Sequence, residues 1–285
     1  MHRSLEARSL VALTTTAAIA AGAAIAVAQE SAPAAPPVVA YTLGKLKSTP
    51  SGPATVPAGA VRFKVSTKVK GEHGFQVFRL ADGADVAAAQ KAVRSISNGT
   101  AFEKLKDITA VGGTEVSVAK PGEATFELTP GNYLFADFSD EKVNPTTPFV
   151  VPAAGATPPA ALPAATATLS MFDYKFEVAG RLPRNGDLRI VNKGKRNHIL
   201  VTFKAQNPAG AARLAKAFKA SNEKAAGKEI RGNATGANII GPGVTQDLAF
   251  DAKPGSYVFV CFYESKASKG KEHNVLGMVK TATVK

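Results

Sequence analysis

Hydrophobic and polar residues alternate in short runs along much of the chain, and this period of two predicts β-strands. In the clearest run, residues 257–262, nearly every side chain is β-branched or aromatic, and Tyr257, Phe259 and Cys261 share one face. Strands are predicted at residues 61–67, 75–80, 115–119, 124–128, 130–138 and 148–151 in the first half, and at residues 175–178, 187–192, 199–203, 247–250, 257–262 and 278–284 in the second.

Two segments have helical rather than strand spacing. Residues 84–96 place Val86, Ala89 and Val93 on one side of a helix, and residues 209–225 are amphipathic in the same way. Many short strands with turn signals between them, interrupted by one helix in each half, favour an all-β fold. We therefore expect two Greek-key β-sandwich domains in tandem, each with an inserted helix.

The beginning of the chain has the composition of a secretory signal peptide. Residues 1–28 combine Arg3 and Arg8 with an apolar Ala-rich stretch and end in a small-residue cleavage site, so cleavage is expected near Ala28. An uncut membrane anchor is the alternative. No later stretch is long and apolar enough to span a bilayer. The mature protein is thus expected outside the cytoplasm, secreted or in a bacterial cell envelope.

Composition also suggests where the domains begin and end. Residues 29–37 are rich in Ala and Pro and predict a disordered spacer. Residues 153–167 are uncharged and again Ala/Pro-rich, as expected of a semi-extended linker. The remaining segments, 38–152 and 168–285, each have the usual length of one domain.

One stretch near the end of the chain gathers unusual chemistry. Cys261, His273 and Met278 follow one another across a single strand, loop and strand, and Cys261 is the chain's one cysteine. A lone cysteine cannot form an intrachain disulfide, so it suggests a metal ligand, a reactive thiol or an inert buried side chain. A thiolate, an imidazole and a thioether together are the soft ligands that copper prefers.

The order of His198, Cys261, His273 and Met278 resembles that of the blue-copper cupredoxin family. The resemblance is carried by GDLRIVN and NH before His198, and by PGSYVFVC, H and GM from Pro254 onward. It implies one type 1 copper ion in the second domain, held by His198, Cys261 and His273 in a plane and by Met278 from the axis. Such a protein carries electrons. Eleven residues separate Cys261 from His273, a longer loop than the familiar members have.

The first half looks like a degenerate copy of the second. In the repeat, Asp137 stands where Cys261 stands, and neither His nor Met follows it in the first half. His73 matches His198 but has no soft partner, so a packing or surface role is expected for it and no copper ligands are expected in the first half. The matching segments are 73–80 with 198–205 and 129–138 with 253–262.

Three other functions stay open or are disfavoured. In one alternative, the long loop leaves His273 out of reach, and the chain is a metal-free cell-surface binding protein. The same soft ligands also suit a Cu(I) storage or delivery protein. An enzyme is not expected, because multicopper oxidases and copper nitrite reductases need many histidines and the mature chain has three. The chain also has no Gly-rich phosphate loop.

Charge is concentrated in the second half. From residue 167 onward the chain has 20 Lys and Arg against 9 Asp and Glu, which accounts for most of the net charge of +13. If the ligand loops meet, their basic residues form a positive surface suited to an acidic redox protein or an anionic cell-surface polymer, although such runs are usually just solvated. Nucleic acid is not expected in an exported chain without a stacking platform. The basic residues are Lys193, Lys195, Arg196, Lys266, Lys269 and Lys271.

Overall fold

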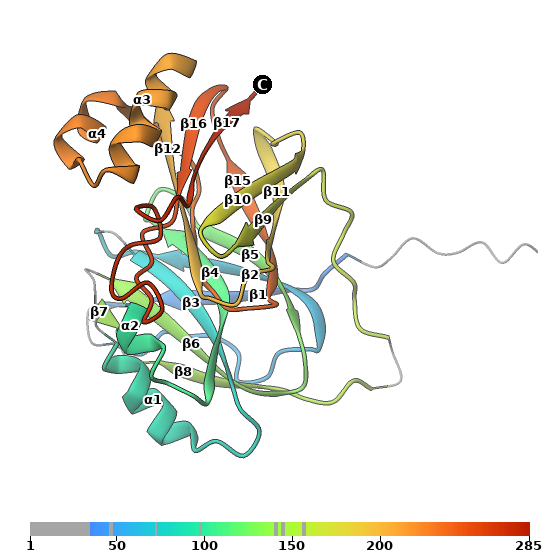
Figure 1. Ribbon diagram of the computed structural model, residues 1–285. Coiled ribbons are helices and arrows are strands. Elements are labelled where there is room, and N and C mark those ends of the chain that lie inside the picture. Colours follow the sequence, from blue (N-terminus) through green and yellow to red (C-terminus); the bar gives the residue numbers. More distant parts are fainter. Residues whose placement is uncertain are drawn as a thin grey trace, which may run out of the picture. The chain divides into compact units, whose positions relative to one another are not determined.

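The structure, a computed structural model, describes residues 35–45, 48–71, 73–96, 99–139, 142–143, 146–155 and 158–285 (Figure 1). The expected signal peptide, residues 1–28, and most of the expected spacer, residues 29–37, lie outside these ranges. Within them, no helix is long and apolar enough to cross a membrane.

One seven-stranded sheet takes strands from both halves of the sequence. Alternating side chains of its strands are buried, as the period-two pattern predicts. The strands stand in the order β1 (Val38–Leu43), β2 (Gly59–Thr67), β5 (Gly122–Leu128), β15 (Thr245–Asp251), β11 (Asn185–Asn192), β9 (Ala167–Phe172) and β10 (Lys175–Gly180).

Two five-stranded sheets complete the strand structure, one in each half. The first consists of β3 (His73–Leu80), β4 (Ile108–Val116), β6 (Gly131–Ser139), β7 (Lys142–Val143) and β8 (Thr147–Val151). The second consists of β12 (His198–Ala205), β13 (Ile230–Asn233), β14 (Ala237–Ile240), β16 (Gly255–Val260) and β17 (Val279–Val284).

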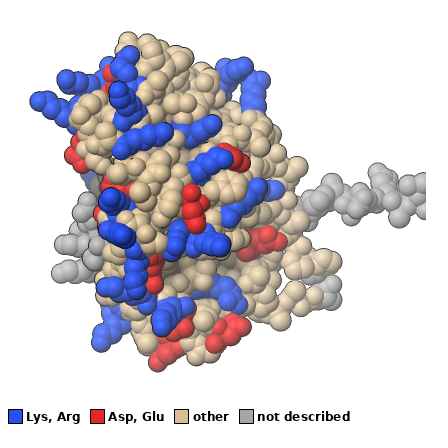
Figure 2. All heavy atoms as spheres, in the orientation of Figure 1, with Lys and Arg blue, Asp and Glu red and all other residues tan. Residues whose placement is uncertain are grey.

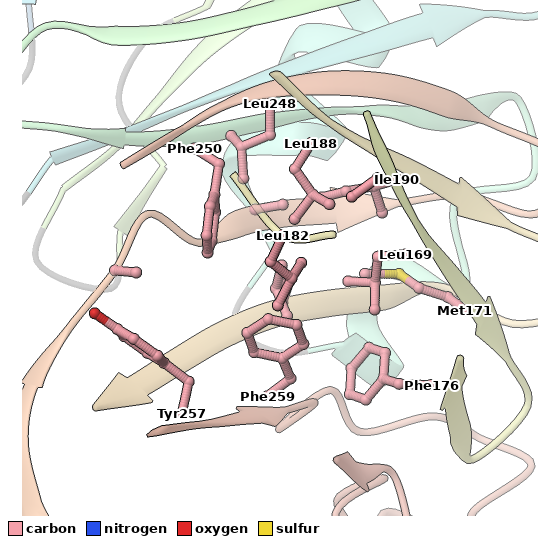
Figure 3. Close-up of a cluster of buried hydrophobic side chains, with 14 of the residues drawn as sticks. Leu169, Met171, Phe176, Leu182, Leu188, Ile190, Leu248, Phe250, Tyr257 and Phe259 are labelled. Atoms are coloured by element: carbon pink, nitrogen blue, oxygen red, sulfur yellow. The ribbon is translucent and has the colours of Figure 1, made fainter. Parts of the chain in front are cut away.

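Each five-stranded sheet packs on one end of the seven-stranded sheet, so the expected pair of β-sandwiches is confirmed. In the second sandwich, Leu188 and Leu248 of the large sheet face Tyr257 and Phe259 of β16 (Figure 3). In the first sandwich, a corresponding cluster of aromatic side chains fills the core. Removing these side chains from water is the main source of stability in both sandwiches.

The sandwiches repeat the same strand connections. β1 runs parallel to β2 and β9 parallel to β11, while β3 pairs with β6 and β12 with β16 in antiparallel fashion. The matched PGNY and PGSY segments also fold alike, because Tyr133 donates to the carbonyl of Thr129 at 2.8 Å and Tyr257 to that of Lys253 at 2.7 Å. The degenerate repeat seen in the sequence is therefore a repeat of structure.

Helices cover the outer face of each five-stranded sheet. They are α1 (Val86–Arg94), α2 (Gly99–Phe102), α3 (Pro208–Lys219) and α4 (Glu223–Glu229). The single helix expected at residues 209–225 is wrong: Ser221 has a positive φ of 47°, and Asn222 caps a new helix by accepting from the amide of Ala225. Leu214 of α3 is fully buried in the same cluster as Val260 of β16.

The two halves are joined more closely than separate domains on a linker require. β5 pairs with β15 in the middle of the large sheet. The expected strand at residues 115–119 is displaced, because β4 covers residues 108–116, and β9 begins at Ala167, the last residue of the expected linker. The division into domains at residues 38–152 and 168–285 stays a prediction.

Candidate metal centre

His198 is the first residue of β12, and the turn before it is held by a buried amide. Asn192, at the end of β11, donates to the carbonyls of Arg196 at 2.7 Å and Ile240 at 2.8 Å, and accepts from the amide of Gly194 at 2.9 Å. Because all three bonds use one side chain that is 0% exposed, the turn has little freedom. The imidazole of His198 therefore enters the core at a fixed point.

The chain after Cys261 forms a loop, residues 264–272, which we call the excursion, and then returns to the neighbourhood of Cys261. β16 ends at Val260, Glu264 bridges to Glu272, and the amide of His273 donates to the carbonyl of Tyr263 at 3.0 Å. The amide of Asn274 donates to the carbonyl of Cys261 at 2.9 Å. The extra residues of the long loop thus project from a narrow base, and they do not carry His273 away from Cys261.

Three ligand atoms converge in the core. The Nδ1 atoms of His198 and His273 lie 3.1 Å apart, and the Sγ of Cys261 lies 3.9 Å from the first and 3.7 Å from the second. All three residues are 0% exposed. Among the described residues, this is the one group of at least three His, Cys, Asp or Glu side chains close enough to hold a metal ion.

These separations fit a trigonal metal site. Ligand atoms at about 2.0–2.3 Å from a first-row metal ion in one plane lie about 3.5–3.8 Å from each other. The two sulfur–nitrogen distances are within about 0.2 Å of that range, and only the nitrogen–nitrogen distance is shorter. A thiolate with two imidazoles selects copper over hard cations such as magnesium. The residues of the second half therefore fit one copper ion.

Met278 is the fourth ligand expected from the sequence, and its backbone is hydrogen-bonded to both His273 and Cys261. Its amide donates to the carbonyl of His273 at 2.9 Å, and its carbonyl accepts from the amide of Cys261 at 3.2 Å. Its side chain is fully buried in the core cluster that contains Cys261. Gly277 turns the chain with a φ of 111°, which favours glycine. Ligation by Met278 stays a prediction.

The buried position keeps the metal-free group uncharged. Burial, and then the neighbouring His273, lower the pKa of His198 to about 4. Burial lowers the pKa of His273 to about 4 as well, and burial raises the pKa of the Cys261 thiol to about 12. Two neutral imidazoles are ready to bind a metal ion, whereas the thiol must release its proton when the ion enters.

Outer contacts orient both rings. The Nε2 of His273 lies 3.1 Å from the hydroxyl oxygen of Ser265, so in the tautomer that donates to Ser265 the Nδ1 atom is free to bind a metal ion. The Nε2 of His198 lies 3.6 Å from the carboxylate of Asp173. The amide of Ile199 donates to the sulfur of Cys261 at 3.4 Å.

The sequence did not reveal Asn192, Asp173 or Ser265 as part of this site. Asn192 lies within the GDLRIVN segment that carries the resemblance, so its position offered a signal. Ser265 lies in the loop between Cys261 and His273 and resembles any loop serine. Asp173 lies in the turn between β9 and β10, far from the ligands in sequence.

The expected basic residues lie on the loops that carry the two histidines. Lys193, Lys195 and Arg196 precede His198, while the other three lie in the excursion before His273. Five of the six are exposed, and Arg196 is half-buried. Figure 2 shows Lys and Arg spread across one face of the molecule with Asp and Glu between them. The exposed basic residues of the excursion are Lys266, Lys269 and Lys271.

Comparison with known proteins gives structural similarity without close sequence similarity. No protein-family model and no curated protein matches the chain. The solved structures that match include reduced auracyanin from Roseiflexus castenholzii, at 18% identity over 41% of this chain and 94% of that one, with a TM-score of 0.27. Auracyanin B matches at 21% identity over 41% and 86%, with a TM-score of 0.27.

A longer match is the multicopper oxidase mgLAC, at 10% identity over 88% of this chain and 86% of that one, with a TM-score of 0.24. The fold and the metal site of this chain are seen in its own paired β-sandwiches and in the distances between its ligand atoms. The chain has the paired β-sandwich fold expected from its sequence, and the second half contains a buried His–Cys–His group that fits one copper ion.

Proposed function

We propose that this chain is an exported copper-binding protein that carries single electrons through a type 1 copper centre in its second half. His198, Cys261 and His273, with Met278 as a further ligand, would hold the ion. The observation that carries the proposal is the convergence of two Nδ1 atoms and one Sγ atom within 3.1–3.9 Å in a fully buried position.

Burial of the ligands supports electron transfer over substrate chemistry. When bound, copper supplies a one-electron Cu(II)/Cu(I) couple, so one electron enters from a reduced partner and leaves to an oxidised one. His198, Cys261 and His273 are all 0% exposed, so a substrate has no direct access to the ligand atoms. The clamped turn before His198 and the narrow base of the loop before His273 favour a geometry that changes little between the two oxidation states.

The direct test is copper binding by the mature chain, residues 29–285. Added Cu(II) should give one bound ion, an intense visible band from thiolate-to-copper charge transfer, and a narrow copper hyperfine splitting in EPR. Cys261→Ser should abolish the band. His73→Gln is the matched control, since His73 occupies the corresponding position in the first half, and it should leave the band intact. A folded protein that binds no copper would overturn the proposal.

Storage or delivery of Cu(I) is the second candidate, because the ligand set is soft. It predicts tight Cu(I) binding with no stable Cu(II) form, so the same titration done with both ions separates the two functions. The metal-free binding role required His273 to lie away from Cys261, and the 3.7 Å separation argues against that requirement.

For the partner, we propose an acidic redox protein that docks on the basic loops. The support is the charge of the six basic residues, which should raise the rate of association with an anion and lose that effect in salt. Electron exchange with an anionic iron complex should slow as ionic strength rises, and exchange with a cationic cobalt complex should accelerate.

Charge reversal tests the location of this docking surface. Replacing three lysines of the excursion by Glu should slow exchange with the anionic complex several-fold. An equal charge change on α3 and α4 should have a much smaller effect, and equal effects would contradict the proposed surface. The test set is Lys266, Lys269 and Lys271, and the control set is Lys219, Lys224 and Lys228.

A further inference from the structure

The loop that returns His273 to the metal centre also touches the first half of the chain. The excursion, residues 264–272, is held together by Ser265 and Ser268, whose amides and hydroxyls bond to each other at 3.0 Å. Ser268 also donates to the carbonyl of Lys271 at 2.6 Å. The excursion is thus a small folded unit, and what fixes its position also fixes Ser265 against the His273 ring.

Three contacts fix the excursion and the preceding Tyr263 on α2 and on Glu103, the residue that follows α2. The hydroxyl of Tyr263 donates to the carbonyl of Gly99 at 2.9 Å, and the amide of Lys266 donates to the carboxylate of Glu103 at 2.7 Å. At Gly99 the backbones approach so closely that an added Cβ would lie 2.2 Å from the carbonyl oxygen of Glu264. Such a close approach requires glycine at this position.

Tyr263 joins this contact to both histidines. Its hydroxyl accepts from the side-chain amide of Asn197 at 3.1 Å, next to His198. Its carbonyl accepts from the amide of His273 at 3.0 Å, and its ring centroid lies 5.6 Å from the His273 ring. Tyr263 thus connects Asn197 and His273 to a helix more than 160 residues away in the sequence, through its hydroxyl, its ring and its backbone carbonyl.

We propose that the first half serves to position the copper ligands, with Tyr263 as the positioning residue and α2 as its support. This gives a role to the first half, which repeats the fold of the second half but has no soft metal ligands of its own. The inference deepens the proposed function, because it assigns the first half a role at the same site. The residue that carries it from the first half is Gly99, which touches no ligand.

The test compares variants in the full chain and reads the histidine rings directly. Tyr263→Phe removes only the hydroxyl, and Gly99→Ala pushes α2 away from Glu264. In the metal-free protein, ¹⁵N spectra of the imidazoles should show shifted ring nitrogens for His273 and His198 in both variants. In the copper-loaded protein, copper should dissociate about 10-fold faster, as when other outer contacts of metal ligands are lost.

Two controls separate positioning from general loss of stability. Tyr257→Phe removes an equivalent hydroxyl that donates to the carbonyl of Lys253 at 2.7 Å. Gly52→Ala crowds the ring of Tyr41 in the first core, with an added Cβ 2.1 Å from it. Both should leave the imidazole spectrum as in the unmodified chain.

Each outcome bears on the inference. If folded Tyr263→Phe and Gly99→Ala proteins keep unchanged ring signals, the inference is wrong whatever copper does. If the rings shift but no form of the protein binds copper, positioning by the first half holds and the copper function fails. If the controls shift the rings as much as the test variants, the effect is general destabilisation and the inference is again wrong.

Discussion

His273 shows how much a single residue of this site depends on its surroundings. Its Nδ1 faces the other ligand atoms, its Nε2 meets Ser265, and its ring packs edge-on against Tyr174 with centroids 5.0 Å apart. A histidine with both ring nitrogens engaged and its ring packed against an aromatic neighbour has one orientation and one useful tautomer. The ligand types were predictable from the sequence, because Cys, His and Met in one turn are rare and chemically specific.

The partners that orient the ligands were not predictable at this scale. Asn192 holds the turn that leads into His198, Asp173 approaches the His198 ring from a different turn, and nothing in a loop serine distinguishes Ser265 before the fold is known. Such contacts depend on which segments meet in space, whereas the ligands themselves are marked by residue type and order.

Replacing Met278 by Leu tests whether it is the axial ligand. Both side chains are apolar and similar in volume, so the free energy of unfolding should fall by less than about 1.5 kcal/mol. If the thioether binds copper, the EPR spectrum and the reduction potential should change. Met171→Leu is the control, since Met171 is fully buried in the same cluster. Equal spectra for both variants would remove Met278 from the ligand set.

The histidine pair should make the metal-free protein sensitive to acid. The pKa of each imidazole is about 4 in the folded chain and near its ordinary 6.5 when unfolded. Above pH 6.5 both imidazoles are mostly neutral in the folded and in the unfolded chain. Between pH 6.5 and 4 the unfolded chain binds more protons, so the free energy of unfolding falls as pH falls, by up to about 1.4 kcal/mol per pH unit for each histidine.

Urea denaturation of the copper-free protein at pH 7, 6 and 5 measures this loss. His198→Gln should show a shallower decline over the same range, because one of the two titrating groups is gone. A decline of equal slope in both proteins would assign the acid sensitivity to other groups.

Among the elements, strands rich in β-branched and aromatic residues were predictable, and the glycine-containing strand β4 was not. The strands predicted at residues 61–67, 124–128, 130–138 and 257–262 agree with β2, β5, β6 and β16 to within two residues at each end. β4 was mostly missed, because Gly112 and Gly113 have the composition of a turn. In the structure they lie at a β-bulge, where the register opposite β3 shifts between Val77 and Phe78.

The reason for these glycines lies in the other half of the chain. Gln246 of β15 reaches into the bulge, where its side-chain oxygen accepts from the amide of Gly113 at 3.0 Å. Gly112 has a φ of 127°, and an added Cβ would lie 1.9 Å from that oxygen. A sequence pattern that is local cannot show that a distant side chain needs this space.

Gly112→Ala should therefore destabilise the protein by at least ~2 kcal/mol, through backbone strain and displacement of a buried hydrogen bond. The free energy of unfolding in urea measures the change. Gly155→Ala is the control, because an added Cβ there meets no atom within 4 Å, and it should have little effect. A loss below about 0.5 kcal/mol at Gly112, the range of ordinary surface changes, would show that the bulge can relax.

For the whole molecule, the sequence predicted two copies but not the sheet that unites them. Polar groups buried between the halves make separation costly: Gln76 donates to the carbonyl of Ile239 at 2.9 Å, and Thr114 donates to that of Gly236 at 2.6 Å. Pulling the halves apart would also leave β5 and β15 with unpaired edges. Amino-acid composition can indicate a linker between the halves, whereas it does not indicate that β5 of one half pairs with β15 of the other.

The two halves should therefore unfold together. Calorimetry should show one transition whose calorimetric and van't Hoff enthalpies agree. Gly52→Ala, which crowds the first core alone, should shift that single transition to lower temperature without splitting it. If two transitions appear and only one moves, the halves fold independently and the pairing of β5 with β15 contributes little. A single shifted transition would mean that damage to the copy without copper ligands lowers the stability of the copper centre too.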